Sequence, residues 1–154
     1  MRIAIVAVGR LGRSPESDLV KTYAERATAS GRALGLGPVE VIEVESRKPG
    51  KAAEAEALRP HLAQSYVIAC DEHGSVRTSR GLAEEIGRLR DSGVRRLAFL
   101  VGGADGLDSD LLHAADSRLA FGPQTWPHAL ARAMLAEQIY RAGTILAGGP
   151  YHRD

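Results

Sequence analysis

The chain has 154 residues and only one cysteine, Cys70, so it cannot form an internal disulfide. Its five histidines are scattered and lack the spacing of a zinc site. Long apolar runs are also missing, because the opening MRIAIVAVGR is apolar over too few residues for a signal sequence or a membrane span. We therefore expect a soluble, cytoplasmic protein with no bound metal and no membrane partner.

An excess of charge is absent as well, since the formal net charge is only +1. A general nucleic-acid binder is usually much more basic, so any contact with RNA must be local. Only three of the 20 basic residues are lysines. Arginine suits phosphates and base edges, but a genome rich in G and C gives the same ratio, and both explanations stay open. Three local sets are candidate phosphate contacts: Arg10 with Arg13, Arg47 with Lys48 and Lys51, and Arg77 with Arg80.

Two common nucleotide motifs are missing. There is no GxxxxGK[ST] segment and no GxGxxG after the first apolar run, which argues against nucleoside-triphosphate and common dinucleotide sites. The sequence also has no internal repeats, linkers or low-complexity tracts. Its length fits one domain, residues 1–154, with one core.

Short apolar runs alternate with helical patterns, which predicts an α/β fold with a mostly parallel sheet flanked by helices. The expected strands are Ile3–Val8, Val39–Val44, Tyr66–Cys70, Leu97–Val101 and Ser117–Phe121. The expected helices begin at Ser14-Pro15, run over about Lys51–Ala63 and Ser79–Arg90, and begin again on Pro127.

The last predicted helix is apolar nearly all round, and its polar residues lie on two different sides, with His128 and Arg132 on one of them. Such a helix is covered on two sides. The second cover is either another copy of the protein or, in a monomer, the rest of the same chain.

Three strand ends are rich in glycine, proline and polar residues, where ligands gather in an open α/β sheet. They are Cys70–Ser75, Val101–Leu107 and Phe121–Trp126. Their backbone groups can hydrogen-bond an adenine edge and a ribose, so a neutral or cationic adenosyl ligand fits better than a polyphosphate. Glycines after a strand can also be tight turns only, and Cys70 itself reads as a small buried hydrophobe rather than a nucleophile.

The chain closes with Tyr151, His152, Arg153 and Asp154 after a Gly-Gly-Pro break. Tails of this kind usually fray without a function. This one carries an aromatic ring for stacking on a base, an imidazole and a guanidinium, which together favour a role with RNA.

Together, MRIAIVAVGRL, VIACDEHGSVRTSRGLAEEI, FLVGGADGL, TWPHALARAMLAEQIYRA and PYHRD resemble the bacterial 23S ribosomal RNA pseudouridine N3-methyltransferase family of the SPOUT superfamily. The resemblance covers the whole chain in the right order. It implies a deep trefoil knot in the C-terminal part, a homodimer, and S-adenosylmethionine as cofactor. The implied cofactor-binding residues are Cys70, Gly102, Phe121, Gly122, Pro123, Gln124, Thr125 and Trp126.

The resemblance also implies that Tyr151, His152 and Arg153 face the RNA of the assembled ribosome as catalytic residues. We expect His152 to accept the N3 proton and Arg153 to stabilise the negative charge on the base. Cys70, Ser75, Arg80 and Gly149 depart from the residues usual in the family. Two alternatives stay open: a SPOUT enzyme that methylates transfer RNA, and an assembly factor that has lost catalysis.

Overall fold

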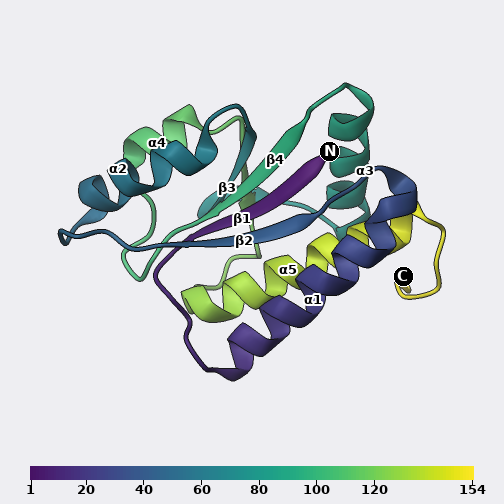
Figure 1. The fold of residues 1–154 in the computed structure, drawn as a ribbon, viewed down its shortest axis with the longest axis horizontal. Helices are drawn as coiled ribbons and strands as arrows, with labels where there is room; N and C mark the ends of the chain where they lie inside the picture. The colour runs from purple at the N-terminus through teal and green to yellow at the C-terminus, as the bar shows by residue number, and fades with distance from the viewer.

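The computed structural model describes residues 1–154, which form five strands and five α-helices (Figure 1). The strands are β1 (Arg2–Val8), β2 (Val39–Val44), β3 (Tyr66–Val76), β4 (Arg96–Val101) and β5 (Ser117–Ala120). The helices are α1 (Pro15–Gly31), the short 3-10 helix η1 (Arg32–Leu34), α2 (Lys51–Leu62), α3 (Ser79–Asp91), α4 (Ser109–Ala114) and α5 (His128–Leu146).

The strands form one sheet in the order β2-β1-β4-β3-β5, and every neighbouring pair is parallel. This confirms the predicted parallel α/β architecture. In the register, Val8 at the end of β1 lies opposite Val44, while Val101 at the end of β4 lies opposite Cys70. The carboxyl ends of the strands therefore meet at one edge of the sheet, where ligands collect in such folds.

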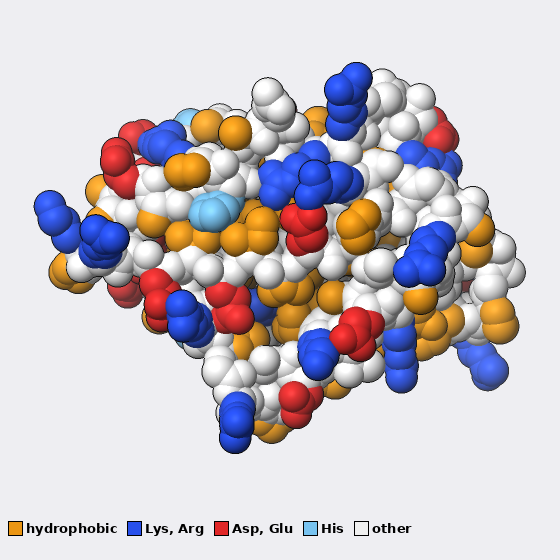
Figure 2. All heavy atoms as spheres, viewed as in Figure 1, with side chains coloured by type: hydrophobic (Ala, Val, Ile, Leu, Met, Phe, Trp, Pro, Cys, Tyr) orange, Lys and Arg blue, Asp and Glu red, His pale blue; other side chains and the backbone are white.

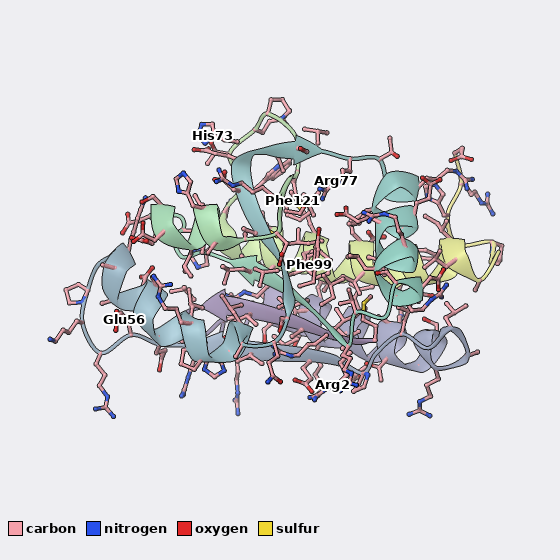
Figure 3. All side chains as sticks on the ribbon, turned by 90° about the horizontal axis from the view of Figure 1, so that it is seen from above. Arg2, Glu56, His73, Arg77, Phe99 and Phe121 are labelled. Carbon is pink, nitrogen blue, oxygen red and sulfur yellow. The ribbon has the colours of Figure 1, made fainter.

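Helices cover both faces of the sheet, giving three layers (Figure 1). Alternate residues of a strand point to opposite faces, so Ile5 packs in the core under α1, α3 and α5, whereas Val6 packs with the residues of α2 and α4. Figure 3 shows Phe99 of β4 in the interior, where it is fully buried. None of the helices is both long and apolar enough to span a membrane.

The predicted helix starts are largely confirmed. The Ser14 side chain caps α1 by accepting from the Ser17 amide at 3.1 Å, as the Ser-Pro pair predicted. The last helix begins one residue later than predicted, at His128. Pro127 has an extended ψ of 137° and is therefore the residue before the helix rather than its first residue.

Two local features differ from the sequence prediction. Strand β3 does not end at Cys70 but continues to Val76, because its pairing with β5 resumes at Ser75. Leu119 is the partner of both Cys70 and Ser75, so the four residues between them bulge out at the carboxyl edge. Helix α4 was not predicted, since six residues are too few for a clear helical pattern.

Helix α5 is covered by its own chain. It packs against α1 and α3 and, through residues such as Leu135 and Ile139, against the core of the sheet. The same chain therefore covers much of the apolar surface of α5, and a second copy stays a prediction for the part that is exposed. Leu130 near its start stays 39% exposed.

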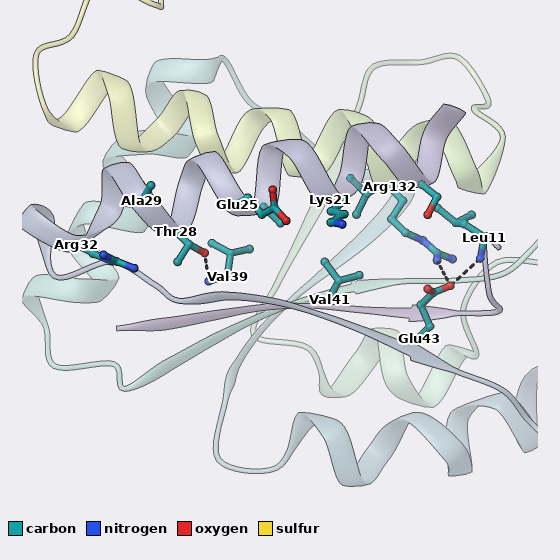
Figure 4. A pocket seen from close by; sticks show the side chains of 13 residues that line it. Leu11, Lys21, Glu25, Thr28, Ala29, Arg32, Val39, Val41, Glu43 and Arg132 are labelled. Carbon is teal, nitrogen blue, oxygen red and sulfur yellow. Dashed lines mark hydrogen bonds and ion pairs between the residues drawn. The ribbon is translucent and has the colours of Figure 1, made fainter. Parts of the chain in front are cut away.

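Arg132 is the main surprise in α5, because its side chain is fully buried. Its guanidinium donates to the carbonyl oxygens of Val8 at 2.9 Å and Gly9 at 3.1 Å, and lies 3.3 Å from Glu43 Oε2 (Figure 4). Glu43 also accepts from the Leu11 amide at 2.7 Å. Burial lowers the pKa of Arg132 and Glu43 opposes this, but a guanidinium stays charged in proteins. Arg132 thus ties the start of α5 to the end of β1.

We expect Arg132→Met to lower the free energy of unfolding by about 3 kcal/mol, because it leaves two partly buried carbonyl groups without a donor and removes the charge that faces Glu43. Urea denaturation measures the change. The matched control is Arg88→Met on the exposed side of α3, which should cost less than about 0.5 kcal/mol. Equal stability of the two variants would show that the buried contacts contribute nothing.

Candidate functional site

A cavity of about 260 Å³ lies at the carboxyl edge of the sheet. All three strand ends singled out in the sequence contribute to its wall, joined by Leu119 of β5 and the first turn of α5. The lining residues are Cys70 to Glu72, Val101 to Leu107, Leu119, Phe121, Gly122, Gln124 to Trp126, His128 and Ala131. The first and second strand ends are about 30 residues apart in the sequence, and the second and third about 20. All three therefore enclose one cavity.

The structure brings together seven of the eight residues predicted to bind the cofactor. These are Cys70, Gly102, Phe121, Gly122, Gln124, Thr125 and Trp126. Pro123 belongs to the same loop but does not line the cavity. Their contact with a cofactor stays a prediction, but their convergence on one cavity meets its first requirement.

The wall of the cavity requires glycine where another part of the backbone comes too close for a side chain. A β-carbon at Gly102 would lie 2.8 Å from the carbonyl carbon of Gly106 and 3.0 Å from the Leu107 nitrogen, which is closer than real β-carbons come. Gly122 has a φ of +99°, a conformation that side-chain-bearing residues rarely adopt. The turns therefore leave backbone amide and carbonyl groups next to the cavity.

Two hydrogen bonds shape the loop between β5 and α5. Trp126 Nε1 donates to the carbonyl oxygen of Phe121 at 3.1 Å and closes the loop on itself. Thr125 Oγ1 lies 3.5 Å from Glu72 Oε2, which connects this loop to the bulge of β3. Trp126 is still 41% exposed, so an apolar ring is available at the rim of the cavity.

The charge of the wall selects the class of ligand. Asp71, Glu72 and Asp105 line the cavity, and no lysine or arginine does; His128 is the one basic side chain there. Carboxylates repel a polyphosphate and attract a cation such as a sulfonium. The cavity therefore fits a cationic adenosyl ligand better than a nucleotide, as the sequence predicted.

Cys70 offers the cavity its backbone rather than a reactive sulfur. Although part of the residue's surface is exposed, burial of the thiol raises its pKa to about 12, so it stays protonated near neutral pH. A thiol is a poor nucleophile until it ionises. This agrees with the interpretation of Cys70 as a small hydrophobe.

The C-terminal tail folds back onto α5 and is not free. The Tyr151 ring packs edge-on against Tyr140, with centroids 4.7 Å apart, and under the guanidinium of Arg141 at 4.8 Å. Its hydroxyl donates to Glu137 Oε1 at 3.0 Å. Burial, together with hydrogen bonds to Tyr23 and Glu137, raises the pKa of Tyr151, so this hydroxyl stays protonated.

Both ring nitrogens of His152 have partners. Arg141 Nη1 lies 3.2 Å from Nδ1 and has no lone pair to offer, so Nδ1 accepts and Nε2 donates to Asp154 at 3.1 Å. Arg80, followed by His152, lowers the pKa of Asp154. Arg153 is exposed and has no ion-pair or hydrogen-bond partner, so its guanidinium remains available to a ligand.

Within one chain the tail and the cavity do not touch. The tail contacts Glu137 and Arg141, whereas the cavity ends at Ala131, and the helical rise places these about 9 to 15 Å apart along α5. A second hollow of about 530 Å³ lies between them and includes Phe121 and Gly122 of the cavity wall as well as Glu137. We call it the side hollow.

Arg77 and Phe121 both line the side hollow, and Figure 3 shows them close together with His73 farther out. Arg77 is neutralised by Glu85, 3.1 Å away, and donates to Ser117 at 2.6 Å. Arg80 is paired with Asp154. Of the three sets predicted to contact phosphates, the set of Arg77 and Arg80 therefore has its charges already compensated.

Sequence reasoning missed the contribution of α5 to the cavity. His128 and Ala131 line it, and Arg132 fixes this end of the helix from beneath. The one available signal was the position of these residues directly after the predicted ligand loop. A helix that follows such a loop begins beside the same edge of the sheet.

Comparison with known proteins gives a full-length match. The family model described as "Predicted SPOUT methyltransferase" matches residues 1–152. A protein of Phenylobacterium zucineum named "Ribosomal RNA large subunit methyltransferase H" is 77% identical, covering 100% of both chains. A protein of the same name from Caulobacter sp. is 71% identical, again over 100% of both chains.

Solved structures agree on the fold. A probable methyltransferase from Bordetella pertussis aligns with a TM-score of 0.56 and 18% identity, covering 92% of this chain and 95% of that one. A probable methylase family protein from Haemophilus influenzae also gives 0.56, with 13% identity, covering 99% of this chain and 70% of that one. At these identities the likeness supports the architecture alone.

We expect Gly102→Ala to raise the dissociation constant for S-adenosylmethionine at least about tenfold, because the added β-carbon pushes the Gly106 backbone out of the cavity wall. Isothermal titration calorimetry measures the change. Gly143→Ala is the control, since its β-carbon meets only Ser30 Oγ at 3.7 Å, away from the cavity. Unchanged binding by Gly102→Ala would place the cofactor elsewhere.

Proposed function

This chain belongs to the SPOUT methyltransferase family, and from that premise we propose that it methylates N3 of a pseudouridine in 23S ribosomal RNA, using S-adenosylmethionine. The observation that carries the proposal is the convergence of three strand ends on one acidic cavity. The names of the relatives over the full chain length supply the class of substrate. We take residues 1–154 to act as one SPOUT-like domain with a knotted C-terminal part.

The residues of the cavity fit the proposed cofactor. Backbone groups around Cys70, Gly102 and the loop from Phe121 to Trp126 would hold the adenosyl group, and the carboxylates of Asp71, Glu72 and Asp105 would attract the positive charge. S-adenosylmethionine brings an already activated methyl group. The protein has mainly to align that group with its acceptor and to exclude water.

The side hollow would receive the target base. It shares Phe121 and Gly122 with the cavity and has apolar and amide groups in its wall, including Met134 and Gln138. A base inside folded RNA has to be splayed out before it can be reached, and a hollow of about 530 Å³ accommodates one ring. In this position the base would lie between the cofactor and the tail.

The tail would supply the groups that act on the base. N3 of pseudouridine is an imide nitrogen that must lose its proton before or during attack. We assign His152 as the acceptor, through its Nδ1 once Arg141 releases that atom, and the unpaired Arg153 as the group that stabilises the resulting anion. Tyr151, protonated and packed on Tyr140, would position the tail.

A homodimer fits the surface near the cavity. Trp126 at the rim is 41% exposed, and Leu130 at the start of α5 and Leu19 of α1 are 39% and 44% exposed. A second copy would bury these apolar groups. Because the tail of one chain lies about 9 Å or more from its own cavity, either its own shifted tail or that of the second copy could complete the site.

The function is tested on ribosomal RNA from a strain that lacks the protein. Mass spectrometry should show one unmethylated pseudouridine in 23S ribosomal RNA, and purified protein with labelled S-adenosylmethionine should restore the methyl group. Whole ribosomes should be much better substrates than a short stem-loop, since a nearly neutral protein grips naked RNA weakly. A protein that binds no cofactor would instead be a non-catalytic assembly factor, and labelling of transfer RNA would identify the other SPOUT class.

His152→Ala should slow single-turnover methylation by about 100-fold or more and flatten its dependence on pH, because the proton acceptor is lost. Quench-flow with labelled cofactor at several pH values measures both. Exposed His113→Ala on α4 is the control and should match the wild type. If His152→Ala keeps the wild-type rate and pH profile, His152 is not the base.

A further inference from the structure

We propose that the loops after β1 and β2 form a phosphate-binding surface that docks the RNA beside the cavity. We call this surface the basic edge, and its side chains are Arg10, Arg13, Arg47, Lys48 and Lys51. The inference rests on the proposed function, because it assigns a place to the RNA substrate. It concerns docking of the polyanion, whereas the tail acts on the target base.

The sheet places the two loops side by side. β1 and β2 are parallel neighbours, and the Gly9 amide donates to the Val44 carbonyl at 2.8 Å directly after both strands end. Arg10 Nε then lies 3.3 Å from Glu45 Oε2 and connects one loop to the other. Arg10 and the start of the loop after β2, which are more than 30 residues apart in the sequence, therefore lie side by side.

The basic edge adjoins the cavity. A β-carbon at Gly103, in the cavity wall, would lie 3.3 Å from Val8 Cγ1 at the end of β1 and 3.7 Å from Glu54 Oε1. Glu54 lies in the first turn of α2, the turn that begins with Lys51. The end of β1 and the first turn of α2, from which the basic edge extends, therefore adjoin the wall of the cavity.

The charges of the basic edge are mostly uncompensated. Arg13, Arg47 and Lys48 are exposed and have no carboxylate within 4.0 Å. Of the nearby acids, Glu45 is paired with Arg10, and Glu43 is held by Arg132. Glu16 and Asp18 in the first turn of α1 limit the patch on that side. This differs from Arg77 and Arg80, which are both paired with carboxylates.

Hydrogen bonds hold the backbone at the start of both loops, while the basic side chains are exposed. Ser46 Oγ donates to the Lys48 carbonyl at 2.6 Å and accepts from the Lys48 amide at 3.2 Å, which sets the turn after β2. The Leu11 amide donates to Glu43 in the loop after β1. Figure 2 shows basic side chains, with acidic ones among them, at the left end and at the lower left of the molecule, where Figure 1 places the loops after β2 and β1. A preformed cationic surface loses little entropy when it binds.

Phosphates are the partner that this surface fits. Arginine and lysine together match the phosphate backbone, which carries most of the affinity in protein–RNA complexes. The molecule as a whole has a net charge of only +1, so a local surface has to supply this attraction. It would attract any folded RNA strand of the right shape and leave the choice of base to the side hollow.

The test replaces Arg13, Arg47 and Lys48 together by alanine. The matched control replaces Arg59, Arg88 and Arg95, three exposed arginines toward the opposite edge, and so changes the net charge equally. Single-turnover methylation at increasing concentrations of purified whole ribosomes that lack the modification is measured at several salt concentrations. Calorimetry with S-adenosylmethionine shows whether the cavity is intact.

The loop variant should need at least tenfold more ribosomes for half-maximal methylation, with unchanged cofactor affinity and saturating rate. The slope of log affinity against log salt should fall by about 2, near 0.7 for each phosphate that the protein no longer neutralises. If the loop variant equals the control variant, the basic edge does not dock RNA. Weaker binding with an unchanged salt slope would assign the surface to ribosomal protein instead and overturn the proposal. Failure of the wild type to methylate any ribosome would refute the proposed function itself.

Discussion

Parallel pairing of all five strands is the constraint on which the rest of the structure depends. Because every strand runs the same way, each strand end emerges at one edge, and the loops there gather without any contact between distant side chains. The register of β3 with β4 and β5 then brings Cys70, Val101 and Leu119 level with one another. The cavity is therefore a product of backbone hydrogen bonding, and four of its 18 lining residues are glycines.

Helix α5 connects the cavity to the C-terminal tail. Its first turn lines the cavity, Arg132 anchors it to the carbonyl groups of β1, and Glu137 and Arg141 hold the tail one to two turns farther along. A tilt of this helix would move both ends of the proposed reaction site together. The burial of a charged residue at its anchor is costly in isolation, but here it fixes one orientation of the helix.

Much of the architecture was predictable because apolar runs of four to seven residues reveal buried parallel strands, as in Ile3 to Val8. The ligand edge was predictable for the same reason: once the strands are parallel, Gly102 and Gly122 must lie at the same edge of the sheet. What the pattern could not reveal depends on three-dimensional neighbours. The extension of β3 to Val76 depends on β5, and α4 is too short to show a period.

Side-chain partnerships were even less accessible. The pattern of α5 placed Arg132 and Arg141 on different sides of the helix, but it did not show that Arg132 is buried on carbonyl groups and that Arg141 faces the tail. Likewise, the sequence grouped Arg77 and Arg80 with the other basic pairs, because Glu85 and Asp154 become their partners only in the fold. The resemblance identified the residues of the tail, but it could not predict that the tail packs on Tyr140.

The carboxyl edge is divided by sign, with cations in the loops after β1 and β2 and the carboxylates of Asp71, Glu72 and Asp105 around the cavity. Such a division gives the edge a lateral dipole. An approaching polyanion is turned so that its backbone meets the positive half, while free nucleotides are kept from the negative half. The abundant triphosphates of a cell would then be weak competitors for the cavity, even though they contain the same adenosine.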